Sequence, residues 1–177
     1  MSMPIVRVTA PLGVYFDRSC IPAATLEAAA VRGTAVHSAC AAFAKGLPVM
    51  VDQDAKLYFD SFRGWFGRYV KRALYVEEEF SDLLTYLITG HPDLVCELAD
   101  GRIVVVDYKT PQAESKTWRA QCAAYCWLVK PAVGPCDGMA LMLDRDGKPA
   151  KGIHYKNQAE DFANYLAALQ AFRAFGG

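Results

Sequence analysis

The chain has 177 residues, enough for one domain with a buried core, and 53% of them are hydrophobic against 21% charged. That balance excludes a long disordered protein. Nineteen basic residues match nineteen acidic ones, so the formal charge of zero gives no support for a protein coated with nucleic acid, although a local basic groove stays compatible with it.

The chain carries no apolar run of the roughly 20 residues that a membrane-spanning helix needs. Its first residues, MSMPIVRVTAPLG, lack the apolar segment after a basic start that marks a signal peptide. We therefore expect a cytoplasmic protein without a membrane contact. In that compartment its six cysteines should be reduced, and their spacing favours buried small side chains over a zinc or cluster site.

Two helices are predicted in the N-terminal part. Residues 22–45 are alanine-rich with helical periodicity, and Pro22 and Gly46 suit the start and the end of a helix. Residues 54–72 follow as a second helix with Asp54 near its start. Its aromatic side chains recur every three or four residues, which is more typical of a core stripe than of a base-stacking platform. Four basic residues fall off that stripe and either form a solvated face or contact phosphates: Arg63, Arg68, Lys71 and Arg72.

Strands dominate the next part of the chain. We expect strands at 73–80, at 84–97 in one or two pieces, and at 102–108, with a hairpin turn through Asp100 and Gly101. A helix over 115–129, with Ser115 as a plausible cap, two strands around the turn RDGKP, and an amphipathic helix over 157–174 complete the chain. This order predicts an α/β fold with a central mixed sheet flanked by helices.

The stretch VVVDYKTP at 104–111 places charges at the end of an apolar strand. Asp107 and Lys109 point to one face of the strand, beside the Tyr108 carbonyl. By themselves they would be a structural ion pair or part of a metal site. Asp93 lies seven residues before the hairpin turn and Asp107 six after it, so the two carboxylates should meet across the hairpin. Two carboxylates, a carbonyl and a lysine suit metal-assisted phosphodiester hydrolysis, with lysine positioning the attacking water.

These residues, which read PD…DYK, resemble the PD-(D/E)xK nuclease motif. RGTAVH at 32–37 and QCAAY at 121–125 resemble the Gly-x-x-x-His and Gln-x-x-x-Tyr motifs of its RecB-like branch, and the motifs stand in family order over residues 25–130. The resemblance implies a restriction-endonuclease-like core (αβββαβ) with an extra N-terminal helical segment, in one domain over 1–177: a helical part at 1–72, the catalytic sheet and motif helix at 73–156, and a C-terminal helix at 157–177.

The resemblance also implies site residues and a cofactor. His37, Asp93, Asp107 and the Tyr108 carbonyl would bind one or two Mg²⁺ or Mn²⁺ ions, and Lys109 would assist the water. Gln121 and Tyr125 share a helix face and would contact the site or the DNA backbone. A further glutamate is expected before the Asp93 strand, and Glu77 is favoured over Glu78 and Glu79 by spacing. His91 and His154 stay unassigned. An iron–sulfur cluster is not expected, because Cys122 and Cys126 lie inside the Gln-x-x-x-Tyr helix and no C-terminal cysteine trio follows Cys136 to join Cys20.

We therefore predict a DNA nuclease, specifically a phage- or bacterial-type exonuclease of recombination or repair. The predicted DNA contacts are Arg63, Arg68, Lys71, Arg72, Lys116 and Arg119. A helicase or recombination protein would be a separate partner, because the chain has no Walker motif, and self-assembly is compatible with the neutral charge. Two alternatives stay open: an inactive nucleic-acid-binding or assembly module on the same fold, and a site-specific endonuclease.

Overall fold

A mixed five-stranded sheet forms the centre of the protein. The computed structural model describes residues 4–15, 22–111 and 113–176. The strand order is β2-β5-β6-β7-β8. The β6–β7 pair is parallel and its neighbours are antiparallel. The strands are β2 (Val70–Val76), β5 (Leu94–Leu98), β6 (Ile103–Lys109), β7 (Asp137–Met142) and β8 (Lys151–Tyr155). This arrangement confirms the predicted α/β class with a mixed sheet.

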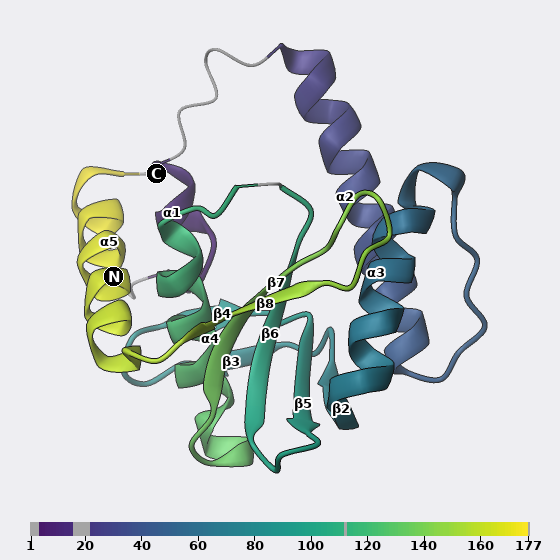
Figure 1. Ribbon diagram of the computed structural model, residues 1–177. Coiled ribbons are helices and arrows are strands. Elements are labelled where there is room, and N and C mark those ends of the chain that lie inside the picture. Colours follow the sequence, from purple (N-terminus) through teal and green to yellow (C-terminus); the bar gives the residue numbers. More distant parts are fainter. Residues whose placement is uncertain (1–3, 16–21, 112, 177) are drawn as a thin grey trace.

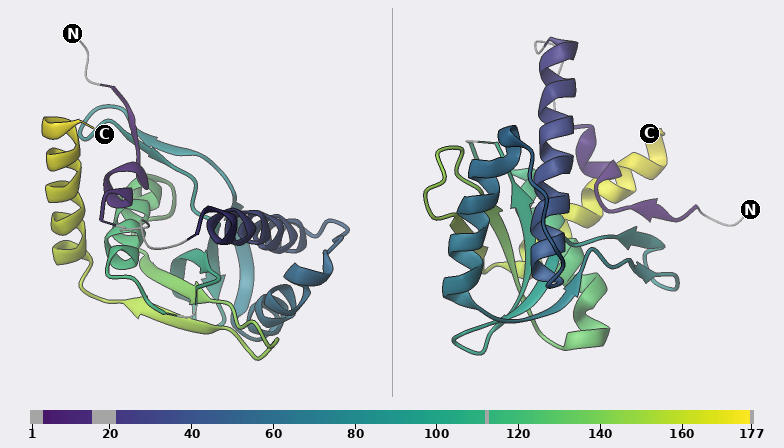
Figure 2. Two further views of the ribbon diagram at one scale, coloured as in Figure 1. Left: turned by 90° about the horizontal axis from the view of Figure 1, so that it is seen from above. Right: turned by 90° about the vertical axis from the view of Figure 1, so that its right-hand side faces the viewer.

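Helices cover both faces of this sheet (Figures 1 and 2). On one side lie α2 (Ala23–Ala44) and α3 (Gln53–Tyr69), and on the other lie α4 (Thr117–Val133) and α5 (Gln158–Phe175). The N-terminal half of α2 projects beyond the rest of the molecule. Because α4 joins the parallel strands β6 and β7, it runs as the crossover that such a pair requires.

The alternation of β6 separates two cores and fixes where its charged end points. Val104, Val106 and Tyr108 pack into the core under α2 and α3. Val105 packs into the core under α4 and α5. Since side chains alternate between the faces of a strand, Asp107 and Lys109 point to the α4 side. The buried strand therefore delivers its carboxylate and ammonium to the helix that carries Gln121.

The hairpin of β5 and β6 forms as predicted. Leu94 pairs with Val106, and Gly101 at the turn has a φ of +86°, a backbone conformation that favours glycine. The two strands around RDGKP are likewise confirmed as the antiparallel pair β7 and β8.

Several predicted boundaries were wrong. The second helix ends at Tyr69 rather than 72, because the chain from Val70 pairs with β5 as a strand. The helix predicted over 115–129 continues through Pro131 to Val133, and its cap residue is Lys116 rather than Ser115. The Ser115 hydroxyl nevertheless accepts a hydrogen bond from the Thr117 backbone N–H at 3.3 Å.

A second, three-stranded sheet was not predicted. Its order is β1-β4-β3, with β1 (Val6–Arg7), β3 (Phe80–Asp82) and β4 (Ile88–Gly90), and the short helix α1 (Ala10–Gly13) follows β1. The strand expected at 73–80 thus divides between β2 and β3, and the one at 84–97 between β4 and β5. Runs of two or three residues are too short for a periodic signal, so only their pairing reveals these strands.

Candidate metal centre and active site

Asp93 lies at the junction of three elements. It immediately precedes β5, and its carboxylate accepts a hydrogen bond from the Tyr108 backbone N–H on β6. The other carboxylate oxygen lies 2.9 Å from Nδ1 of His37 on α2. The Asp93 carbonyl accepts from the backbone N–H of Glu77 at the end of β2. Asp93 is buried, and through these three contacts it connects α2, the β5–β6 hairpin and the end of β2.

His37, Glu77 and Asp93 form a cluster whose candidate ligand atoms all lie within 4.8 Å of one another. Glu77 has a φ of +52°, an uncommon conformation for a residue with a side chain. The turn made there directs Glu77 to the cluster. Of the other glutamates, Glu79 instead contacts Thr89 and His91.

The electrostatics of this cluster show an excess of negative charge. Burial opposes protonation of His37, but the carboxylates of Asp93, Asp107 and Glu77 together outweigh it and raise the pKa of His37 to about 9. Burial and the charge of Asp93 raise the pKa of Glu77 to about 7. Carboxylates held close together raise both pKa values, whereas burial raises the pKa of Glu77 but lowers that of His37. A divalent cation would relieve this repulsion.

A second network lies on the α4 side. The Lys109 ammonium forms an ion pair with Asp107 and donates to Oε1 of Gln121 at 3.0 Å. Nε2 of Gln121 donates to the other carboxylate oxygen of Asp107, Oδ1, at 2.8 Å. The Asp107 and Lys109 side chains are only 7% and 15% exposed. Lys109 also lies over the Trp118 ring, 5.3 Å from its centroid, so its position is fixed from three sides.

Burial and electrostatics act in opposite directions on this pair. Burial raises the pKa of Asp107, and the charge of Lys109 counteracts it. Burial would lower the pKa of Lys109, but Asp107 more than compensates, so the pKa of the lysine is raised. Lys109 is therefore held as an ammonium ion beside the carboxylates.

Tyr125 completes the α4 side. Its hydroxyl accepts from Nε2 of Gln121 at 3.3 Å, and its buried ring lies against Gly90 on β4. A Cβ atom at Gly90 would stand 2.6 Å from the Tyr125 ring. Gly90 is thus required for the close approach of the helix to the small sheet, a constraint that the sequence did not reveal.

The two networks meet because Asp93 and Asp107 are neighbours across the β5–β6 hairpin. The N–H and C=O groups of one strand residue point to the same edge, so the Tyr108 carbonyl faces the Asp93 side. The structure therefore brings together all of the predicted catalytic and metal-binding residues: His37, Glu77, Asp93, Asp107, Tyr108, Lys109, Gln121 and Tyr125.

The donor set fits a hard divalent cation. Carboxylate and carbonyl oxygens are what Mg²⁺ and Mn²⁺ prefer, and an imidazole is better suited to Mn²⁺ than to Mg²⁺. An open pocket of about 730 Å³ adjoins His37, Glu77 and Asp93, so a substrate can reach the cluster from solvent.

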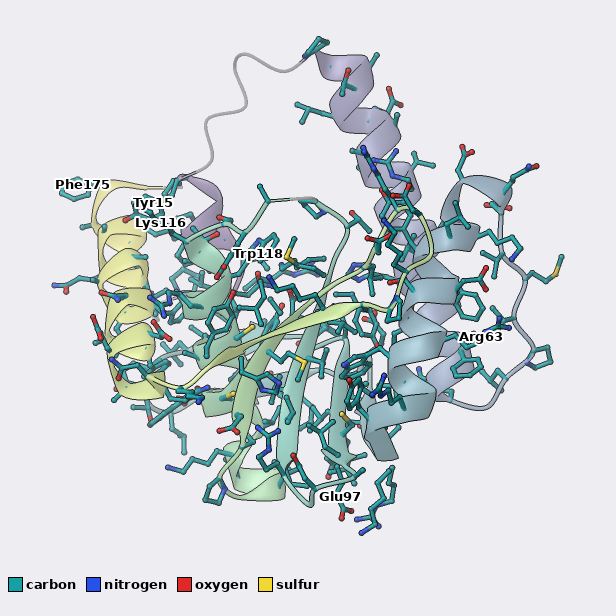
Figure 3. The ribbon with its side chains drawn as sticks, viewed as in Figure 1. Tyr15, Arg63, Glu97, Lys116, Trp118 and Phe175 are labelled. Atoms are coloured by element: carbon teal, nitrogen blue, oxygen red, sulfur yellow. The ribbon has the colours of Figure 1, made fainter. Side chains whose placement is uncertain are left out.

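The predicted DNA-binding residues divide into two groups. Lys116 and Arg119 lie at the start of α4, just before Gln121, although Arg119 pairs with Asp161 at 3.1 Å. The others lie away from the cluster. Lys71 and Arg72 pair with Glu97, four residues and about 13 Å along β5 from Asp93. Figure 3 places Glu97 and Arg63 far from Trp118, which contacts Lys109. Arg63 pairs with Asp60, and Arg68 lies over the Tyr69 ring.

None of the cysteines that the structure describes belongs to the cluster of candidate ligands. Cys40, Cys96, Cys122 and Cys126 are buried free thiols, and Cys136 is half-buried. Cys20 lies outside the described residues. Within the described ranges, no helix combines the length and the apolar character needed to span a membrane.

Comparison with known proteins gives a match to one family. Residues 50–174 match the sequence model of the PD-(D/E)XK nuclease superfamily. The match covers Glu77, Asp93, Asp107, Lys109, Gln121 and Tyr125, whereas α2 and His37 precede it. No curated protein matches the chain.

Proposed function

Because the chain belongs to the PD-(D/E)XK nuclease superfamily, we propose that it is a Mg²⁺- or Mn²⁺-dependent deoxyribonuclease. The observation that carries this proposal is the junction at Asp93. One side of it offers the His37, Glu77 and Asp93 ligand atoms, and the other offers a buried ammonium fixed by Asp107 and Gln121. A module that only binds DNA has no need to hold several carboxylates beside phosphates.

The metal ligands in this proposal are His37, Glu77, Asp93, Asp107 and the Tyr108 carbonyl, which suffice for one or two ions. A bound cation would polarise a phosphate oxygen and lower the pKa of a water. Asp107 has a second task, because it orients Lys109 through their ion pair.

Lys109 supplies the positive charge that the chain itself brings to the reaction. Its ammonium donates hydrogen bonds, so it can position the attacking water and stabilise the negative charge that develops on the phosphate. Gln121 bridges Lys109 and Asp107 and fixes the orientation of both side chains. Tyr125 holds the amide of Gln121 in turn. Preorganised donors of this kind need no rearrangement at the moment of reaction.

Exonuclease action in phage or bacterial recombination or repair is the finer proposal. It is supported by the resemblance of residues 32–37 and 121–125 to the RecB-like motifs. We also propose that residues 1–177 act as one nuclease domain, since His37 of the N-terminal part contacts Asp93 directly.

The test is cleavage of linear, closed circular, single-stranded and double-stranded DNA by the purified protein with Mg²⁺ or Mn²⁺, and with a chelator. Wild type should cut at least one substrate only with metal. Asp107→Ala and Lys109→Ala should abolish cutting, whereas Asp146→Ala, an exposed aspartate on the β7–β8 turn, should not.

Three outcomes would count against this function. Absence of cutting on every substrate, or full activity of the two site variants, contradicts a nuclease. Metal-independent DNA binding without cutting indicates the inactive module. Discrete fragments from closed circular DNA indicate a site-specific endonuclease rather than an exonuclease.

A further inference from the structure

The pocket beside the cluster has one long wall made by α2. Apart from His37, its lining from that helix consists of small residues, including Gly33, Thr34, Ser38, Ala41 and Ala42. A Cβ atom at Gly33 would meet nothing within 4 Å. The wall is therefore open at Gly33, about one helical turn from His37.

Lys45 stands at one end of this wall. It directly follows α2 and lines the same pocket as His37, Glu77 and Asp93. Eight residues separate it from His37, which is about 12 Å along a helix axis.

The ammonium of Lys45 differs from several other basic groups of the protein. Lys56, Arg63, Lys71, Arg72 and Arg119 each pair with a carboxylate. In residues 4–15, 22–111 and 113–176, no hydrogen bond or ion pair within 4 Å involves the Lys45 side chain. It can bind an anion without breaking an existing interaction. A phosphate backbone that approaches the acidic cluster needs such a counter-charge.

We propose that Lys45 binds a backbone phosphate of the DNA strand that is cut, and that this strand lies along the small-residue wall of α2. The inference rests on the proposed function and adds a substrate contact to it. The phosphate bound by Lys45 is not the one that is hydrolysed, since Lys45 lies two helical turns from His37. Lys45 thus contributes affinity and places the strand over the cluster.

The test is binding of a fluorescein-labelled single-stranded 20-nucleotide DNA in Ca²⁺, followed by fluorescence anisotropy over a series of salt concentrations. Lys45→Ala should weaken binding by roughly threefold to tenfold and reduce the slope of log affinity against log salt by about 0.7, the share of one phosphate contact. Lys45→Arg should stay within about twofold of wild type, because it keeps the charge.

Lys56→Ala is the matched control, since Lys56 is an exposed lysine of α3 that already pairs with Asp60. The inference would be overturned if Lys45→Ala kept the affinity and salt slope of wild type. An equal loss of DNA affinity in Lys56→Ala, or no DNA binding by wild type, would also overturn it. Lys45-dependent binding by a protein that cuts no DNA would support the inference and overturn the nuclease proposal alone.

Discussion

Replacement of Gln121 by leucine tests how Lys109 is held. The substitution keeps a similar volume but removes the hydrogen bonds to Asp107, Lys109 and Tyr125, at 2.8, 3.0 and 3.3 Å. The first two connect the Gln121 amide to a charged group, and hydrogen bonds to charged groups contribute about 1.5–3 kcal/mol each. Because Asp107 and Lys109 stay paired with each other, we expect the lower end of the sum, about 3 kcal/mol.

The assay is urea and thermal unfolding of wild type, Gln121→Leu and Gln170→Leu. A loss of about 3 kcal/mol corresponds to a melting temperature lower by roughly 6–12 °C for a chain of this size. Gln170 is exposed on α5, so its substitution should change stability by less than about 0.5 kcal/mol.

Activity should fall as well, because Lys109 would lose one of the groups that orient it. Loss of a group that orients a site residue typically costs about 10–100-fold. A Gln121→Leu protein as stable and as active as wild type would refute the reasoning. It would show that Asp107 and Lys109 position each other without the amide.

Three further predictions concern other parts of the molecule. Gly90→Ala should destabilise the fold by about 1–3 kcal/mol, because the new methyl group overlaps the Tyr125 ring. Gly33→Ala, with open space at its Cβ, should instead stabilise α2 by about 0.5–1 kcal/mol. An equal change in unfolding free energy for the two variants in chemical denaturation would contradict this reasoning. Calorimetry should detect Mn²⁺ binding to wild type, and Mn²⁺ at 100 times its dissociation constant should stabilise wild type by about 2.7 kcal/mol. The stability of Asp93→Ala should not change with Mn²⁺. Mn²⁺ binding by Asp93→Ala with wild-type affinity would exclude Asp93 as a ligand. Burial opposes ionisation of Asp82, but hydrogen bonds from Thr85 and Trp127 prevail and lower its pKa below 3.8. Ionised Asp82 therefore stabilises the fold above pH 3.8, and this stabilisation is lost as the pH falls through the lowered pKa of Asp82 in the folded protein. The stability advantage of wild type over Asp82→Asn should shrink in that pH range, and a constant difference would contradict this account.

The part of the site on regular strands could be predicted from the sequence. The turn at Asp100 and Gly101 fixes the register of β5 and β6, and the period of two puts Asp107 and Lys109 on one face. The i, i+4 spacing likewise places Gln121 and Tyr125 together. Local rules suffice where hydrogen-bond ladders are regular.

The remainder depends on irregular backbone and tertiary contacts. Counting faces along VEEEF cannot place Glu77, because its positive φ ends the alternation of β2. Nor could periodicity reveal that Gly90 makes room for Tyr125, since β4 belongs to a separate small sheet. Nothing in the sequence indicated that Lys71 and Arg72, which stay predicted DNA contacts, pair with Glu97 on β5.

The most direct test of metal-assisted hydrolysis at this site is single-turnover cleavage of labelled DNA by Lys109→Met, with Mn²⁺ binding measured on the same sample. The proposed roles predict Mn²⁺ affinity close to that of wild type and a cleavage rate lower by at least about 100-fold, the cost of removing one donor that stabilises developing charge. A cleavage rate within twofold of wild type, at equal Mn²⁺ occupancy, would contradict the assignment of Lys109 and of the site built around it.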